Sequence, residues 1–173
     1  MDVLRFAFLG PLVGALSRAF SGSLADRFGG ARVSLWVFVA MVLCVFGVLV
    51  FLDSRSFSGF FAMFLLLFFF SGVGNASTTQ MIPAIFRQQT PLLNPSLSPA
   101  EQQLQSDKES AAAVGFISAV AAYGAFFIPK AYGSSIALSG SAAPALYGFT
   151  LFYGVCIALT WFYYTRRNAE VPC

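Results

Sequence analysis

One arginine lies inside the first apolar stretch of this sequence. Arg18 interrupts the run 3–24 and precedes Asp26 by eight residues, about 12 Å along a helix. A guanidinium within a bilayer is costly, so such residues usually face a cavity, a partner or a substrate. We therefore expect Arg18 to contact a substrate. The alternative is an arginine that snorkels to the interface or that pairs with another helix.

Small residues recur around this arginine. A spacing of four residues separates the members of the series Gly10, Gly14, Arg18, Gly22 and Asp26. Each step of four turns about 40° on an α-helix, so the glycines lie close to the face of the arginine. This pattern predicts that another helix approaches the backbone there.

A second polar cluster follows a strongly aromatic half-span, residues 57–70. The sequence from Gly72 to Thr79 changes abruptly to small and hydroxyl-bearing residues. Asn75 offers an amide that can donate a hydrogen bond to an anion, and helical spacing places it near Gly72 and Thr79. An anion site and plain close packing of helices are equally compatible with this cluster.

A third cluster joins a helix end, an acid–base couple and a glycine turn. This motif consists of Gly22, Asp26, Arg27, Gly29 and Gly30. Asp26 and Arg27 could latch a neighbouring helix and act in gating. The segment could equally be a tight connection between two spans, and the two interpretations are compatible.

Composition decides the class of protein that must position these residues. Of 173 residues, 58% are apolar and only 10% are charged, with 21 phenylalanines. A soluble globule or a disordered chain is thereby excluded, and an all-α, polytopic membrane helical bundle is predicted. Histidine is absent and the three cysteines lack metal-binding spacing, so neither a metal site nor a cofactor is expected. The net charge of +3 reflects membrane topology and does not indicate a nucleic-acid partner.

The whole chain, residues 1–173, is interpreted as one partial transmembrane domain. Pro83 and Pro129 are expected to break the third and fourth spans, which are longer than a bilayer requires. The five expected spans are residues 3–24, 33–52, 57–86, 111–138 and 145–164.

Lysine and arginine predict the orientation of these spans. Residues 27, 32, 87, 108, 166 and 167 carry positive charge on one side, and residues 5, 55 and 130 on the other. Positive charge favours the cytoplasm, so we expect an inner-membrane protein with a cytoplasmic C-terminus. The polar stretch 88–110 is predicted to be a mobile cytoplasmic loop. At its end, Ser106 is a candidate N-cap with Glu109 three residues on.

These motifs together resemble the C-terminal half of a nitrate/nitrite porter, a branch of the major facilitator superfamily. The match begins at about the eighth transmembrane helix of that family. Ala76 departs from it, since the family has glycine there. The segments that carry the resemblance are residues 8–18, 22–30, 72–83, 115–119 and 126–135.

The resemblance implies a function and a site. It implies transport of nitrate and nitrite by alternating access, with two helical halves rocking about a site at the midplane. A guanidinium can donate two parallel hydrogen bonds to a planar, singly charged oxyanion such as nitrate. The substrate-binding residues that it implies are Arg18, Gly72, Gly74, Asn75 and Ser77.

The resemblance also implies that this chain is an incomplete carrier. Its expected partners are nitrate, nitrite, the lipid bilayer and the missing N-terminal half. No acidic residue lies deep in a span, which favours nitrate/nitrite exchange over proton-coupled uptake. The alternative function is a small structural or interaction membrane protein, or a transporter remnant. An enzyme is not expected, because no catalytic cluster is present within the spans.

Overall fold

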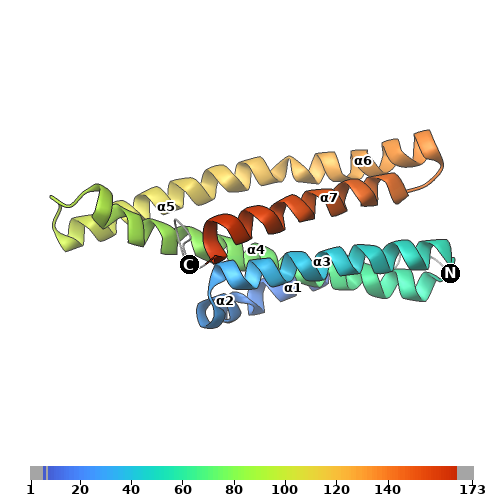
Figure 1. The fold of residues 1–173 in the computed structure, drawn as a ribbon, viewed down its shortest axis with the longest axis horizontal. Coiled ribbons are helices and arrows are strands. Elements are labelled where there is room, and N and C mark those ends of the chain that lie inside the picture. Colours follow the sequence, from blue (N-terminus) through green and yellow to red (C-terminus); the bar gives the residue numbers. More distant parts are fainter. Residues whose placement is uncertain (1–5, 7, 167–173) are drawn as a thin grey trace.

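The computed structural model describes residue 6 and residues 8–166, and within them it contains helices and no strand. The all-α membrane helical bundle predicted from composition is thereby confirmed. Figure 1 shows the elements in order along the chain. They are α1 (Leu9–Phe20), α2 (Gly22–Phe28), α3 (Gly30–Asp53), α4 (Phe57–Leu93), α5 (Pro99–Ala122), α6 (Gly124–Ser139), α7 (Ala143–Thr160) and the π-helical turn η2 (Trp161–Thr165).

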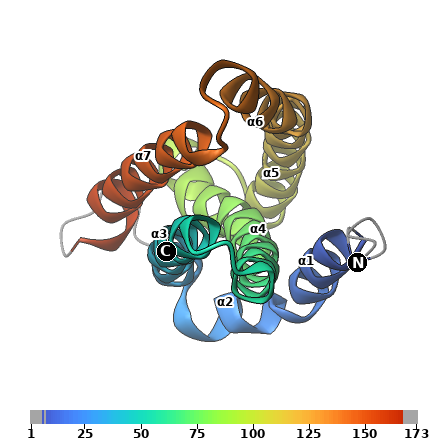
Figure 2. The same ribbon diagram turned by 90° about the vertical axis from the view of Figure 1, so that its right-hand side faces the viewer.

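Helix α4 is the centre of the arrangement. Helices α1, α2, α3 and α5 pack against it, and α7 packs against α3 (Figure 2). The α2–α3 and α4–α5 connections lie at one end of the bundle, and the α3–α4 and α6–α7 connections lie at the other (Figure 1). The helices thus alternate in direction, as consecutive membrane spans must.

The buried apolar core lies between α3, α4 and α7. In one part, Val33 and Val37 of α3 meet Val73 of α4. In the other, Val45 and Val48 of α3 pack on Leu146 of α7, against which half-buried aromatic residues also pack. Helix α6 has no buried residue among those described. Several of its large apolar side chains, such as Phe126, Phe127 and Leu138, are exposed.

Four helical stretches are long and apolar enough to cross a membrane, whereas five were expected. They are residues 30–53, 57–93, 99–139 and 143–165. Helix α1 has 12 residues and is therefore only about 18 Å long. The beginning of the first expected span, residues 3–5 and 7, lies outside the described residues.

A bend at Ser21 separates α1 from α2. The Ser21 amide and hydroxyl both donate to the Ser17 carbonyl oxygen, and the Leu24 amide donates back to Ser21 at 3.1 Å. Hydroxyl bonds of this kind compete with the helical ladder, and Gly22 follows directly. The four-residue pattern of glycines around Arg18 therefore spans two short helices instead of one.

Neither predicted proline break is found at its proline. Helix α4 continues through Pro83 to Leu93, and α6 continues through Pro129. Packed membrane helices tolerate proline because their neighbours satisfy the freed backbone groups. The fourth span is instead interrupted at Tyr123, where the Tyr123 amide bonds the Val120 carbonyl at 3.1 Å in a tightened turn.

The predicted mobile loop 88–110 is wrong as a description of the backbone. Helix α4 extends to Leu93, and α5 begins at Pro99. The N-cap is Ser98 and not Ser106, since Ser98 and Glu101 form a complete capping box ahead of a proline in the first turn. The Ser98 amide donates to Glu101 Oε2 at 2.9 Å, and the Glu101 amide donates to Ser98 Oγ at 3.4 Å.

Substituting Ser98→Ala is expected to fray the start of α5. Losing an N-cap hydroxyl costs about 1 kcal/mol of helix stability. Amide hydrogen exchange over residues 100–103 should accelerate accordingly. Ser96→Ala is the matched control, because Ser96 is exposed and outside the capping box. Equal exchange in the two variants would contradict the assigned cap.

Candidate functional site

Close contact between α1 and α4 positions Arg18. A side chain at Gly72 would collide with Ser17 Oγ and the Gly14 carbonyl oxygen, and it would lie 3.0 Å from the Arg18 amide nitrogen. In turn, a side chain at Gly14 would lie 3.3 Å from the Phe68 carbonyl oxygen. The predicted backbone approach at the glycines of α1 is therefore confirmed, with α4 as the partner helix.

Arg18 and Asn75 line the same cavity. This cavity has a volume of about 570 Å³ and is bounded by α1, α3, α4, α5, α7 and η2. Both residues are exposed to it from neighbouring helices, as the close contact of α1 and α4 requires. The remaining polar and sulfur-bearing side chains of the lining are Ser34, Thr78, Thr79, Met81, Ser118, Cys156, Thr160 and Tyr164.

The electrostatics of the cavity favour an anion. Arg18 is the one formally charged side chain among the described lining residues. The hydroxyl of Thr79 donates to the Asn75 carbonyl at 2.7 Å, and that of Thr78 donates to the Gly74 carbonyl at 2.8 Å. These hydroxyl protons are already used within α4. The charged guanidinium and the Asn75 amide remain as donors for a ligand, beside hydroxyls such as those of Ser118 and Tyr164.

Three of the predicted site residues pack helices together and do not line this cavity. Gly72 faces α1, and a side chain at Gly74 would lie 3.0 Å from Val37 Cγ1 of α3. Ser77 is fully buried, and its hydroxyl bonds Ser34 Oγ at 2.8 Å. Successive residues of a helix point about 100° apart, so one short motif supplies both a cavity wall and two packing faces.

The variant Ser77→Ala is expected to weaken the α3–α4 contact without changing ligand affinity. Interhelical hydrogen bonds in membranes are worth about 0.6–2 kcal/mol. The thermal midpoint of the protein in detergent should fall, while the affinity of the cavity for an anion should stay constant. A selective loss of affinity at unchanged stability would instead restore Ser77 to the ligand site.

The glycine motif at the α2–α3 connection has a structural basis. Gly29 adopts φ 86°, which other residues rarely do, and ends α2. A side chain at Gly30 would meet Met81 and lie 3.1 Å from the Ser77 carbonyl oxygen, and one at Gly22 would lie 3.0 Å from Gln80 Nε2. The motif thus holds α2 and α3 against α4.

The two charged residues of this motif are exposed. Asp26 and Arg27 lie on the surface of α2. Between described residues, the structure contains one ion pair, from Arg87 to Asp107 at 3.5 Å. The proposed latch of Asp26 and Arg27 therefore stays a hypothesis.

Sequence reasoning missed the wall that α7 and η2 contribute. The cavity is lined by Cys156 and Thr160 of α7 and by Tyr164 of η2. Their spacing of four residues was a usable signal for one helical face. Ser34 was also missed, because a single serine in an apolar span gives no distinctive pattern.

Comparison with known proteins identifies related sequences. No family model matches the chain. It is 47% identical over 178 residues to the nitrate/nitrite transporter NarU of Salmonella typhimurium, covering 98% of this chain and 38% of that protein. The resemblance to nitrate/nitrite transporters is confirmed.

Two further relatives agree with this result. The chain is 43% identical to the nitrate/nitrite transporter NarU of Escherichia coli, over 97% of this chain and 37% of the relative. It is 36% identical to the probable nitrate/nitrite antiporter NarK2 of Thermus thermophilus, over 99% of this chain and 35% of the relative. The chain thus spans little more than a third of the length of the curated relatives that it matches.

Proposed function

We propose that this chain forms the C-terminal transmembrane part of a carrier that moves nitrate and nitrite across the bacterial inner membrane. The observation that carries the proposal is the shared cavity of Arg18 and Asn75. It places one guanidinium and one amide donor in a cavity without a described acidic side chain, where a small monovalent anion is attracted. The relatives named above support this choice of anion, since both NarU proteins are nitrate/nitrite transporters.

The geometry suggests how nitrate would be held. Arg18 would donate a pair of hydrogen bonds to two nitrate oxygens, and Asn75 would donate to the third from α4. Gly72 would act indirectly, because it lets α1 approach α4 closely enough for the two donors to share a cavity. Gly74 and Ser77 would fix α4 against α3 in the same indirect way.

The rest of the carrier would come from sequence that the longer relatives have in addition. Helix α6 and much of α5 expose apolar side chains, and side chains at Gly115 and Gly133 would meet nothing within 4 Å. We propose that these faces pack against the other half of the carrier or against lipid. Alternating access would follow from rocking of the two halves. Positive charge at the end bearing the α2–α3 connection would place that end, and the C-terminus, in the cytoplasm.

A chimaera tests the proposed function. This chain would replace the aligned segment of the Salmonella NarU, and the chimaera would be reconstituted in liposomes loaded with nitrite. We expect uptake of ¹⁵N-nitrate above that of protein-free liposomes. A chimaera that inserts and is monodisperse but moves no nitrate, beside an active parent NarU, would contradict the proposal. It would favour the alternative of a packing protein.

The same liposomes distinguish exchange from proton-coupled uptake. No acidic side chain lines the cavity among the described residues, so this part of the carrier offers no proton acceptor beside the anion. We therefore propose exchange. Uptake should depend on internal nitrite and not on an imposed pH gradient. Uptake driven by a pH gradient into nitrite-free liposomes would show proton coupling instead.

A further inference from the structure

A second cavity lies on another face of the bundle. It has a volume of about 660 Å³, within the range of small-molecule sites, and lies between α2, α3 and α4. It shares no lining residue with the cavity of Arg18 and Asn75. Whatever it binds is therefore separate from the transported anion.

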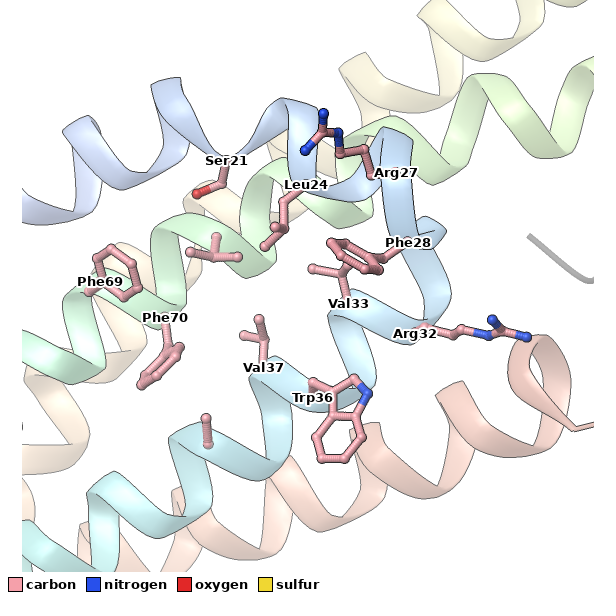
Figure 3. A pocket seen from close by; sticks show the side chains of 12 residues that line it. Ser21, Leu24, Arg27, Phe28, Arg32, Val33, Trp36, Val37, Phe69 and Phe70 are labelled. Carbon is pink, nitrogen blue, oxygen red and sulfur yellow. The ribbon is translucent and has the colours of Figure 1, made fainter.

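The second cavity is polarised along its length. Figure 3 shows Phe69 and Phe70 of α4 at one side and Arg27 and Arg32 at the side of the α2–α3 connection. Between them, the walls are mainly aliphatic side chains of α3 and α4. The groove therefore has an apolar body, and its mouth carries two arginines whose guanidinium groups point in different directions (Figure 3).

The position of this mouth matches a membrane interface. Arg32 is in the first turn of α3, which is one of the helices able to span a membrane. Trp36 lies about 6 Å further along the helix and is 72% exposed at the cavity. Tryptophan prefers the level of the lipid headgroups, and arginine at that level attracts anionic lipid.

We propose that this cavity binds one anionic phospholipid. Arg27 and Arg32 would turn toward the phosphate and bind it. Trp36 would mark the glycerol level, and an acyl chain would lie between α3 and α4 toward Phe69 and Phe70. A phospholipid combines negative charge at one end with an apolar chain at the other, which is the polarity of the groove. Two of the three walls, α3 and α4, belong to helices long enough to span a bilayer, so the occupant enters from the membrane and not from water.

Native mass spectrometry of the purified chain tests the lipid site. The protein would be released from detergent containing equal amounts of palmitoyl-oleoyl phosphatidylglycerol and phosphatidylcholine. We expect one phosphatidylglycerol to be retained in preference to phosphatidylcholine. The variant Arg27→Gln/Arg32→Gln should lower this retention roughly tenfold or more. Arg87→Gln/Lys108→Gln is the matched control, since it removes two charges outside the groove and should retain the lipid.

A second variant tests the apolar part of the same groove. Ala40→Trp would fill the cavity without touching either arginine, and retention of phosphatidylglycerol should fall. The proposal is overturned if both lipids are retained equally, if the control loses as much as the arginine pair, or if Ala40→Trp has no effect. Displacement of the lipid by inorganic phosphate at equal concentration would show a simple anion site and also overturn it. None of these results depends on whether the chain transports nitrate.

Discussion

Substituting Arg18→Lys is expected to lower nitrate exchange by the chimaera roughly ten- to hundredfold, because a hydrogen bond to a charged group is worth about 1.5–3 kcal/mol. Lysine keeps the positive charge but cannot offer the planar fork that matches two nitrate oxygens. The cavity contains no other described cation that could replace it. Initial rates of ¹⁵N-nitrate uptake at several concentrations would measure the loss.

The control for this substitution is Arg87→Lys. Arg87 lies near the end of α4 and pairs with Asp107 on the surface, outside the cavity. Exposed ion pairs contribute little, so this variant should transport normally. Normal exchange by an inserted Arg18→Lys variant would remove Arg18 from the substrate site. It would leave a structural or snorkelling arginine as the explanation.

Substituting Gly72→Ala is expected to destabilise the chain by about 1–3 kcal/mol, the usual cost of overpacking. The added methyl group would collide with Ser17 Oγ and with the Gly14 carbonyl oxygen. A backbone atom cannot swing aside as a flexible side chain can, so α1 would have to move away from α4. Arg18 is next to Ser17 in α1, so this movement would displace Arg18 as well. We therefore also expect nitrate exchange to fall. The thermal midpoint of the purified chain and the uptake rate of the chimaera report the two effects separately.

Gly133→Ala is the matched control for this prediction. It makes the same chemical change within α6, where the added methyl group would meet nothing within 4 Å. Alanine is the better helix former by about 1 kcal/mol, so the control should be neutral or slightly stabilised. If the two variants unfolded at the same temperature, the close α1–α4 contact would be contradicted.

Composition and local chemistry were enough to predict the class of fold and to single out Arg18 and Asn75. A long apolar run has few structural options in a bilayer, which is why the helices could be anticipated. Arg18 stood out because a charged side chain inside such a run is energetically costly and usually faces a cavity, a partner or a substrate. Asn75 stood out because an amide follows an aromatic half-span. Both residues now line one cavity.

The faces of the helices could not be predicted in the same way. Ser77 lies two residues from Asn75, and sequence spacing alone does not show which of them turns toward α3 and which toward the cavity. The structure decides this through the bond between Ser77 and Ser34, residues 43 positions apart. The bend at Ser21 was equally hidden, because a serine hydroxyl competes with the helix only in some packing contexts.

The polar segment 88–110 shows how a composition signal misleads. Its prolines and acidic residues are typical of loops, but Pro99 occupies the first turn of α5 and Glu101 completes a capping box. Both residues start a helix when they stand at its N-terminus. Whether proline and acidic residues indicate a loop or the start of a helix thus depends on where the N-cap lies.

Equilibrium binding of nitrate tests the central claim most directly. The purified chimaera would be titrated with nitrate by calorimetry, in a buffer without other oxyanions. We predict saturable binding that Arg87→Lys retains and that both Arg18→Lys and Asn75→Leu weaken at least tenfold, each variant folding normally. Unchanged nitrate affinity in the Arg18 and Asn75 variants would contradict the assignment of this cavity as the nitrate site.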